Sequence, residues 1–462
     1  KILLINPPPR HICDEPIVVP PLGLGYLAAV ARKAGHDVCI LDAFAEQLTW
    51  EAFSARVAPS RYDIIALSGM TPVFDTVQKA LQICRSHTDW LILGGPHATV
   101  FADTVLRENP CLDAAVFGEG EETWAELLSA LDSGGIFSAI PGVITREWKG
   151  AARQWVENLD ALPFPARDLL PNEKYRYPLC GGRRITTISS SRGCPYQCVF
   201  CDKSIFGSHW RARSAANVLE EIDEVVMRFG VQSIIFYDDL FTLNKDRLAA
   251  ICEGLIERNY NLFWKAEGRV DTVDAECLQL MKRAGCDSLA YGVESGNQHG
   301  LDWIGKKTTP DMARRAFRLT REAGIKTLGY FILGIPVETY NDALRTIKFA
   351  IELKTDYAQF SILSPLPGSR LYIMAKDEGW YSEIKAHNVF DKDLKRPVLI
   401  TKNWDEAKLS AIIQEAHRRF YMRPSYWFRT LLSIRTWGEA QTICRSGKKM
   451  MKYIIGFLWR AP

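Results

Sequence analysis

The sequence lacks three features that would assign it to a broad class at once. It has no run of about 18 apolar residues, the length that a transmembrane helix needs. Its first residues, KILLINPPP, do not follow the pattern of a secretory signal peptide, because prolines end the apolar stretch after six residues. Its formal net charge is only +3, which gives no indication of nucleic-acid binding. We therefore expect a cytoplasmic protein without a nucleic-acid partner.

The chain also lacks the composition of a disordered or disulfide-stabilised protein. Hydrophobic residues make up 47% and charged residues 24%, as in ordinary globular proteins. Its 462 residues correspond to two to four domains, at roughly 100–200 residues per domain. Twelve cysteines in a large chain without a secretory signal are expected to be free thiols. Nine of them are scattered, at Cys13, Cys39, Cys84, Cys111, Cys180, Cys252, Cys277, Cys286 and Cys444.

Short apolar strands alternate with helical patterns over the first 135 residues. Each strand is bounded by turn residues, as in a buried parallel sheet. Strands are expected at 1–6, 37–43, 63–70, 90–95 and 114–120, and helices near 22–34, 74–87, 99–108 and 121–132. We therefore predict a doubly wound, Rossmann-like α/β domain over residues 1–135, with its ligand beyond the carboxyl ends of the strands.

A second alternation begins after a proline-rich stretch. Residues 136–183 contain a predicted hairpin and the extended segment ENLDALPFPARDLLPNEKYRYPL, so we expect a linker. The second set of strands is expected at 185–190, 233–239, 262–268, 288–295, 326–335 and 357–365, with helices between them. Six units are too few for a closed eight-fold barrel, so residues 184–370 predict a partial (β/α)6 barrel with its chemistry at the carboxyl ends of the strands.

Three cysteines, Cys194, Cys198 and Cys201, follow the first strand of this second set. Their spacing is C-x3-C-x2-C, within SRGCPYQCVFCDK. Three thiolates can hold three irons of a [4Fe–4S] cluster, and most such clusters use four cysteines. The fourth iron then keeps an open position for a substrate or cofactor, as in other catalytic metal sites. The alternative is a zinc site with Cys180 or His209 as its fourth ligand.

This spacing, with an aromatic residue before the last cysteine, resembles the radical S-adenosylmethionine (SAM) superfamily. The resemblance covers residues 184–370, where YDDLFT, AEGRVD, YGVESG, GYFILGIPVET and PLPGS follow in the order of that superfamily's strand motifs. It implies an external electron donor and reductive cleavage of SAM to a radical that takes a hydrogen atom from the substrate. The residues it places at SAM are Phe200, Tyr237, Asp238, Asp239, Glu267, Arg269, Glu294, Ser295, Leu333 and Gly334.

A doubly wound domain ahead of such a barrel resembles the cobalamin-binding members of the superfamily. PPLGLGYLAAV, LGGPHAT and FGEGEET are similar to their N-terminal motifs, and strand-end glycines let a flat corrinoid approach the backbone. The D-x-H-x-x-G signature, whose histidine ligates cobalt in other cobalamin domains, is absent, so the resemblance implies cobalamin without a histidine ligand. The residues implied to contact it are Pro21, Leu22, Gly23, Ser68, Met70, Thr71, Gly94, Gly95, Pro96, His97, Gly118, Glu119, Gly120 and Glu121.

Several of these residues also have a structural interpretation. Asp238 and Asp239 suit a solvated strand end as well as a functional site, whereas an unpaired Glu294 is costly to bury, which favours contact with SAM. Arg211 and Arg213 suit either neutralisation of cluster or SAM charge, or ion pairs with the acids at 220 and 221. Core packing, turn contacts or local ion pairs are the alternatives for Tyr26, Met70, His97, Tyr237, Arg269, Tyr291 and Tyr330.

Residues 371–462 are predicted to form a basic helical region. Ten Lys and Arg but a single acid, Glu439, lie between Arg418 and Arg460, together with many aromatic residues. Such a region suits a charged helix pair packed on the barrel, or contact with an anionic membrane surface. We expect peripheral contact with the inner face of the membrane.

The predicted activity is transfer of a methyl group to an unactivated carbon of a hydrophobic or natural-product substrate, such as a lipid, isoprenoid or tetrapyrrole. A ring-forming, ring-contracting or oxidative reaction would need the same cofactors and stays an alternative. A methylthiotransferase would need a second close set of three cysteines in the N-terminal domain, which is absent. The alternative of another class, a cobalamin sensor without catalysis, would have no use for a cluster with an open position. No side chain beyond the cluster ligands and cofactors is assigned a catalytic role.

Overall fold

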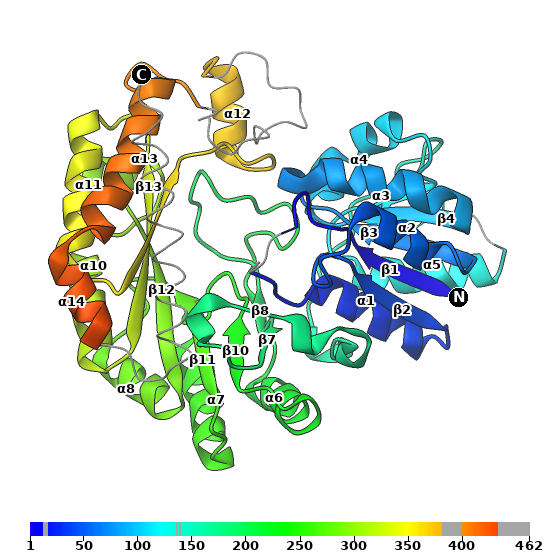
Figure 1. The fold of residues 1–462 in the computed structure, drawn as a ribbon, viewed down its shortest axis with the longest axis horizontal. Coiled ribbons are helices and arrows are strands. Elements are labelled where there is room, and N and C mark those ends of the chain that lie inside the picture. The colour runs from blue at the N-terminus through cyan, green and yellow to red at the C-terminus, as the bar shows by residue number, and fades with distance from the viewer. Residues whose placement is uncertain (13–16, 135–136, 138–139, 381–398, 433–462) are drawn as a thin grey trace.

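A computed structural model describes residues 1–12, 17–134, 137, 140–380 and 399–432 of the chain (Figure 1). These residues form two α/β domains that lie side by side and are joined by an extended segment (Figure 1). No helix within these ranges is long and apolar enough to cross a membrane.

The N-terminal domain is built on a sheet with the strand order β2-β1-β3-β4-β5-β6. Its strands are β1 (Ile2–Asn6), β2 (Val38–Asp42), β3 (Tyr62–Ser68), β4 (Thr88–Gly94), β5 (Ala114–Val116) and β6 (Val143–Ile144). Its helices are α1 (Leu22–Lys33), α2 (Trp50–Val57), α3 (Phe74–Cys84), α4 (Pro96–Glu108) and α5 (Glu121–Asp132). The first five strands are parallel and match the predicted ones.

Two separate apolar cores cover the two faces of this sheet. Leu3 shares one core with Phe53 and Val105 of α2 and α4. Leu4, the next residue along the strand, shares the other core with Trp124 of α5. Successive side chains of a strand point to opposite faces, so both faces are buried by helices. The predicted doubly wound domain is confirmed.

The short strand β6 lies in the segment that was expected to be a linker. It pairs antiparallel with β5, with Ala115 opposite Ile144. The sheet therefore continues past residue 135, where we expected the domain to end. β5 has only three residues, and β6 covers the edge that β5 would otherwise expose.

The second domain is a parallel sheet with the strand order β14-β13-β12-β11-β10-β7. Its strands are β7 (Ile185–Ile188), β10 (Ser233–Phe236), β11 (Phe263–Gly268), β12 (Cys286–Glu294), β13 (Lys326–Leu333) and β14 (Tyr357–Ile362). Its helices are α6 (Ala215–Phe229), α7 (Lys245–Arg258), α8 (Ala275–Arg283), α9 (Gln298–Trp303), α10 (Pro310–Glu322) and α11 (Tyr340–Glu352). The predicted partial (β/α)6 barrel is confirmed, and α10 and α11 lie on the side away from the N-terminal domain, whereas α6 and α7 lie at the bottom of the view (Figure 1).

Local sequence signals explain where most barrel helices begin. A polar side chain just before the helix accepts a hydrogen bond from a backbone N–H of the first turn, which stabilises the helix start. These N-cap residues are Ser214, Asn244, Asp274, Thr309 and Thr339.

The described part of the basic C-terminal region packs on the barrel. It comprises α12 (Arg370–Asp377), α13 (Glu406–Tyr421) and α14 (Pro424–Leu432). The Tyr421 hydroxyl donates to the Ala358 carbonyl at 2.6 Å, and Arg429 donates to the Thr355 carbonyl at 2.7 Å. The packed helix pair is therefore confirmed for α13 and α14. Residues 433–462, which hold most of the predicted basic, aromatic tail, lie outside the described residues.

Candidate active site

The three clustered cysteines lie on the loop after β7, at the carboxyl end of the first barrel strand, as predicted. Cys198 is buried, Cys194 is partly buried and Cys201 is exposed. The Lys203 ammonium donates to the carbonyl of Cys194 at 2.8 Å and to the carbonyl of Tyr196, so a single side chain closes the loop on itself. The three sulfur ligands therefore share one braced loop, and one of them is open to solvent.

This donor set fits a [4Fe–4S] cluster better than a zinc ion. Among the described residues, no three His, Cys, Asp or Glu side chains are placed to hold a single metal ion, whereas a cluster distributes its thiolates over several irons. Cys180 is buried in a core with Val18 and Tyr175, and His209 lies at the surface beside Glu157. Neither residue completes a zinc site, so the zinc alternative is not supported.

Positive charge surrounds the buried cysteine of the loop. The hydrogen bond with Cys201 and the charges of Lys306 and Arg269 lower the pKa of Cys198. Iron is bound by thiolates rather than thiols. The charges of Lys306 and Arg269 thus favour a thiolate at Cys198, whereas the hydrogen bond between the two cysteines raises the pKa of Cys201.

The tandem acids that follow β10 hold the start of the cysteine loop. Asp238 accepts hydrogen bonds from the Ser190 N–H at 2.6 Å, the Ser191 hydroxyl at 2.7 Å and the Ser190 hydroxyl. Asp239 accepts the Gly193 N–H at 3.0 Å, and burial raises its pKa. Asp238 is only 3% exposed, so the solvated strand end is wrong for this residue. Its oxygens are engaged by the loop, which leaves Asp239 as the acid open to a ligand.

Glu294 ends β12 in an unusual backbone conformation. Its φ angle is +66°, a region that non-glycine residues rarely adopt, and the register between β12 and β13 shifts at this point. Its Oε1 atom accepts a hydrogen bond from Lys306 Nζ at 2.7 Å, and both side chains are buried. The sequence argument treated this glutamate as unpaired. The structure instead pairs its carboxylate with Lys306. Backbone strain of this kind is concentrated at functional sites.

Arg269 links β11 to the cysteine loop. It forms a two-pronged ion pair with Asp271, at 2.9 and 3.1 Å, which confirms the local ion pair that we considered. Its guanidinium also lies 3.4 Å from the ring centroid of Tyr196, between the first two cysteines of the loop. Arg269 thus helps to position the cysteine loop.

Four of the other predicted SAM residues are packed within the barrel. The Leu333 side chain is fully buried in the core that faces the helices. A Cβ atom on Gly334 would lie 2.5 Å from a leucine of α13, and the Ser295 hydroxyl donates to Glu338. Phe200 packs on a small core below the loop. Only the backbone of Leu333 and Gly334 is therefore available to SAM.

Of Tyr237, Tyr291 and Tyr330, for which core packing was the alternative to a functional role, two lie on the face of the barrel sheet away from the helices. Tyr237 is 50% exposed, and the Tyr330 hydroxyl donates to Glu267 Oε1 at 2.9 Å. Tyr291 is instead buried in the helix-facing core, with its hydroxyl 2.7 Å from that of Thr320. The packing alternative is therefore confirmed for Tyr291 alone.

The carboxyl ends of the N-terminal strands are partly open, as a cobalamin site requires. Met70 is 58% exposed, so the core-packing alternative is wrong for it, whereas Tyr26 is buried. A side chain added at Gly23 or Gly118 would meet no atom within 4 Å. Gly95 has a φ angle of +93°, and a Cβ there would lie 2.7 Å from a serine hydroxyl, so only glycine fits. This surface suits a flat group that lies on the strand ends.

His97 does not take part in this open surface through its ring. The ring is fully buried, stacks 3.7 Å from the Phe74 ring centroid, and has Nδ1 3.1 Å from the Thr71 hydroxyl. The turn contact that we considered is confirmed, and direct contact of this ring with a corrinoid has no support. The other predicted cobalamin residues near helix starts or strand ends are Pro21, Leu22, Ser68, Gly94, Pro96 and Gly120.

Glu119 and Glu121 form a buried ion-pair cluster with two arginines of the barrel domain. Arg211 donates to both oxygens of Glu119, each at 2.9 Å. Arg192 donates to Glu119 at 3.1 Å and to Glu121 at 2.6 Å. Arg211 therefore pairs across the domains rather than with an acid at 220 or 221, whereas Arg213 pairs with Glu221 as considered. Both carboxylate oxygens of Glu119 and one oxygen of Glu121 are therefore engaged by arginines rather than left for cobalamin.

Sequence reasoning missed Arg192, Lys306 and the serines before the loop. Arg192 immediately precedes the Gly-Cys pair of the loop, and this position is the one signal that could have identified it. Lys306 lies in IGKKTTP, where nothing distinguishes it from Lys307. Only the fold brings Lys306 to Glu294.

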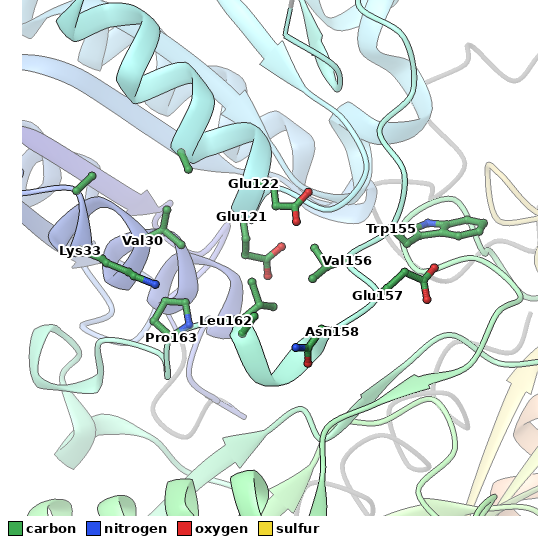
Figure 2. Close-up of a pocket in the computed structure, with 13 residues that line it drawn as sticks. Val30, Lys33, Glu121, Glu122, Trp155, Val156, Glu157, Asn158, Leu162 and Pro163 are labelled. Atoms are coloured by element: carbon green, nitrogen blue, oxygen red, sulfur yellow. The ribbon is translucent and has the colours of Figure 1, made fainter.

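A hollow of about 660 Å³ lies next to Glu121 of the buried ion-pair cluster, between α1, α5 and residues 155–163 (Figure 2). Its lining includes Glu121, Lys33 and Trp155, and none of the loop cysteines or predicted SAM residues. We therefore do not assign the reaction to it.

Two family models match the chain: the B12 binding domain over residues 16–128 and the Radical SAM superfamily over residues 188–350. An uncharacterised methyltransferase of Pyrococcus horikoshii is 35% identical, over 92% of this chain and 93% of its own. The anaerobic magnesium-protoporphyrin IX monomethyl ester cyclase of Rubrivivax gelatinosus is 28% identical, over 88% and 74%. The radical SAM methyltransferase TsrM of Kitasatospora setae, solved with cobalamin and a [4Fe–4S] cluster, has a TM-score of 0.70 at 19% identity, over 88% and 80%.

Proposed function

Because the chain belongs to the cobalamin-dependent radical SAM family, we propose that it methylates an unactivated carbon of a small molecule, with a [4Fe–4S] cluster, SAM and cobalamin as cofactors. The observation that carries the proposal is a three-cysteine loop at the carboxyl end of the barrel, joined by buried ion pairs to a domain with open glycines at its strand ends. When bound, these groups supply a methyl carrier and a radical that activates the substrate carbon.

The protein's own part begins with holding the cysteine loop. Asp238 binds the residues before it, Lys203 braces it internally, and Arg269 packs on Tyr196 in its middle. Cys201 is exposed, so a one-electron donor can approach a cluster held there. Rigid placement of a reactive centre relative to its substrate is the main contribution a protein makes to cofactor chemistry.

Glu294 is the best candidate for binding the amino group of SAM. It lies at the carboxyl end of a barrel strand, and its Oε1 is already held by Lys306. The ammonium of Lys306 pairs with this buried carboxylate, and the pair compensates part of the cost of burying either charge alone. The second oxygen then remains for a ligand.

We place the corrinoid on the strand ends of the N-terminal domain, over Gly23, Gly94 and Gly118 and beside Met70. None of these residues offers a nitrogen ligand to cobalt, and the ring of His97 is buried. The expectation of cobalamin without a histidine ligand is consistent with that placement.

We assign the substrate to hydrophobic small molecules such as lipids, isoprenoids or tetrapyrroles. Support comes from the sequence match to a cyclase whose name specifies a tetrapyrrole, and from apolar side chains on the last described helix. Phe428, Leu431 and Leu432 of α14 are each at least 60% exposed. Together with the basic composition after Arg418, they support peripheral contact with an anionic membrane.

The test is an anaerobic incubation of the reconstituted protein with cobalamin, reductant, SAM and lipid extracts. Formation of both 5′-deoxyadenosine and S-adenosylhomocysteine, with a methylated product, is the expected result. The Cys198→Ala variant should form neither nucleoside product. Cleavage of SAM by that variant, or no S-adenosylhomocysteine from the wild type with any extract, would contradict the proposal.

A second candidate is an oxidative or ring-forming reaction with the same cofactors. The match to the cyclase over 88% of this chain favours it. It predicts 5′-deoxyadenosine without S-adenosylhomocysteine. A sensor without catalysis is not supported, because the family matched here consists of enzymes.

A further inference from the structure

The inner face of the barrel sheet, which points away from the helices, carries polar side chains on β11 and β14. In β11, Trp264 and Ala266 belong to the helix-facing core, so the alternate residues Lys265 and Glu267 point inward. The alternation repeats in β14, where Phe360 belongs to the core and the residues on either side of it, at 359 and 361, are exposed. Closed barrels of this type fill their interior with branched apolar side chains, so a polar inner face indicates a ligand space.

Lys265 is the unusual member of this face. It is only 8% exposed, and no carboxylate or carbonyl among the described residues accepts a hydrogen bond from its ammonium. Its Nζ atom lies 3.8 Å from the ring centroid of Tyr177, which the linker brings over the sheet. Its neighbours across the sheet, Ile235 and Ser288, offer no charge. Burial accordingly lowers the pKa of Lys265.

Two more tyrosines lie near Glu267, the inward neighbour of Lys265 on β11. The charges of Glu267, Tyr177 and Tyr237 all act on Tyr330, which places the four groups close together. Glu267 accepts the hydroxyl of Tyr330 at 2.9 Å, and its charge also acts on Lys265, although no hydrogen bond or ion pair joins the two among the described residues. The result is a nearly buried lysine in contact with Tyr177, near an acid that Tyr330 binds.

A largely buried ammonium without a hydrogen-bonded anionic partner is costly, and contact with an aromatic face offsets only part of that cost. An anion delivered by a ligand would complete the site. The tyrosines would cover an apolar or aromatic body attached to that anion. No other buried lysine described here has this arrangement, because Lys306 is paired with Glu294.

We propose that Lys265 binds an anionic group of the methyl acceptor, a carboxylate or a phosphate, and that Tyr177, Tyr237 and Tyr330 hold the apolar or aromatic body next to it. The inference rests on the proposed function, because it names the substrate class of the same site. An anion-binding lysine at this place restricts the proposed class of hydrophobic substrates to amphiphiles with one negatively charged end.

The experiment uses three probes with the same ring and different head groups: 1-naphthoate, 1-naphthyl phosphate and the neutral 1-naphthalenemethanol. Binding to the full chain with its cluster reconstituted is measured by equilibrium dialysis in a buffer without phosphate. We expect at least one anionic probe to bind tenfold more tightly than the alcohol. The tighter of the two anions distinguishes a carboxylate from a phosphate.

Variants at position 265 test whether Lys265 causes the preference for anionic probes. Lys265→Met should lose the preference for anions and keep the affinity for the alcohol, whereas Lys265→Arg should keep both. Lys79→Met is the matched control, since Lys79 also lies over an aromatic ring, 4.4 Å from the Trp50 centroid, but at the surface. Absence of an anion preference in the wild type, or an equal loss of all three probes in Lys265→Met but not in Lys265→Arg, would overturn the proposal.

The assay is independent of SAM cleavage. Failure to form S-adenosylhomocysteine would therefore count against the proposed function and leave the anion preference standing. Absence of the anion preference in the wild type, or its persistence in Lys265→Met, would count against the role of Lys265 alone.

Discussion

Arg211 of the barrel domain forms a bidentate ion pair with Glu119 of the N-terminal domain, and each guanidinium nitrogen lies 2.9 Å from a carboxylate oxygen. The two residues are 92 positions apart in the sequence and almost fully buried. Arg192 adds a further contact to Glu119 and lies two residues before the first loop cysteine. The strand-end loop of one domain thus directly contacts the base of the cysteine loop of the other.

Removal of Glu119 from this ion-pair cluster should strongly destabilise the folded protein. Glu119→Ala leaves Arg211 and Arg192 buried with too little negative charge, and such a loss costs about 3–5 kcal/mol of folding free energy. Urea unfolding and limited proteolysis of the linker measure the effect. Asp168→Ala is the matched control, because Asp168 forms an equally two-pronged pair with Arg32 at the surface, where ion pairs contribute at most about 1 kcal/mol. Equal losses in both variants would contradict this prediction.

Each of the three loop cysteines should be essential for the cluster. Replacement of Cys194, Cys198 or Cys201 by Ala is expected to abolish SAM cleavage and to leave cobalamin binding intact, because the corrinoid is assigned to the other domain. Iron content, 5′-deoxyadenosine formation and the corrinoid spectrum measure these effects. Cys180→Ala, a buried cysteine in a different core, should retain iron and activity. Loss of iron in that variant would make Cys180 a fourth cluster ligand and contradict the open iron position.

Lys306 should affect SAM through Glu294. Lys306→Met leaves the Glu294 carboxylate buried without its ion-pair partner, which is unfavourable and removes the contact that holds this side chain in place. We expect at least a tenfold weaker affinity for SAM, measured by equilibrium dialysis with the reconstituted protein. The adjacent Lys307 is exposed, so Lys307→Met is the control and should bind SAM normally. Lys306→Arg should recover part of the affinity. An unchanged affinity in Lys306→Met would exclude this role.

Glu267 should make stability depend on pH. Burial raises its pKa above the ordinary value of 4.5, although the hydrogen bond from Tyr330 lowers it. The folded protein therefore holds this proton more tightly than the unfolded chain does, and the stability that results is present at low pH. It is lost as the pH rises from 4.5 through the raised pKa of the folded state.

The Glu267→Gln variant has no such proton to lose. The free energy of unfolding of the wild type minus that of Glu267→Gln should fall over this pH range and be constant above it, as measured by urea unfolding at a series of pH values. Tyr330→Phe removes the hydrogen bond that lowers the pKa and should extend the fall to higher pH. A difference that rises with pH would show that the shift has the opposite direction.

The C-terminal region should bind anionic vesicles. Flotation with vesicles of phosphatidylglycerol should carry the full chain upward, and added salt should reduce the effect because surface charges are screened. A chain that ends after Leu432 keeps α14 and removes residues 433–462, whereas a chain that ends after Met422 removes α14 as well. Comparison of the two assigns the contact to the helix or to the residues beyond it. Equal flotation of all three chains would refute membrane contact through this region.

The sequence predicted the strands and the cysteine loop because these features are local. Short apolar runs bounded by turn residues indicate parallel strands, and the spacing of the three cysteines can be recognised within eight residues. Partners that only the fold brings together could not be predicted. Glu119 and Glu121 stand in a glycine-rich strand end that suits a cofactor, and nothing near them shows that their carboxylates belong to arginines of another domain. The same limit applies to Lys306, which is 12 residues from Glu294 and lies in a loop.

Burial was the other quantity that the sequence could not provide. His97 follows a glycine pair at a strand end, where an exposed ligand contact is a reasonable expectation, yet its ring is enclosed by Phe74 and Thr71. Lys265 stands between apolar residues in LFWKAEG, where strand periodicity predicts that alternate side chains reach solvent. The linker, through Tyr177, covers this lysine instead. A crossing segment without regular structure has no periodicity from which such a contact can be inferred.

The buried pairs between Gly118–Glu121 and the arginines at 192 and 211 restrict how these domains can be exchanged. A chimera that joins this barrel to the N-terminal domain of a relative would bury two guanidinium groups, and they would need acids at the positions of Glu119 and Glu121. Domain shuffling among such enzymes must therefore transfer the GEGE segment together with the barrel. Engineers who seek new substrates by recombination should set the crossover before Gly118 rather than in the proline-rich linker.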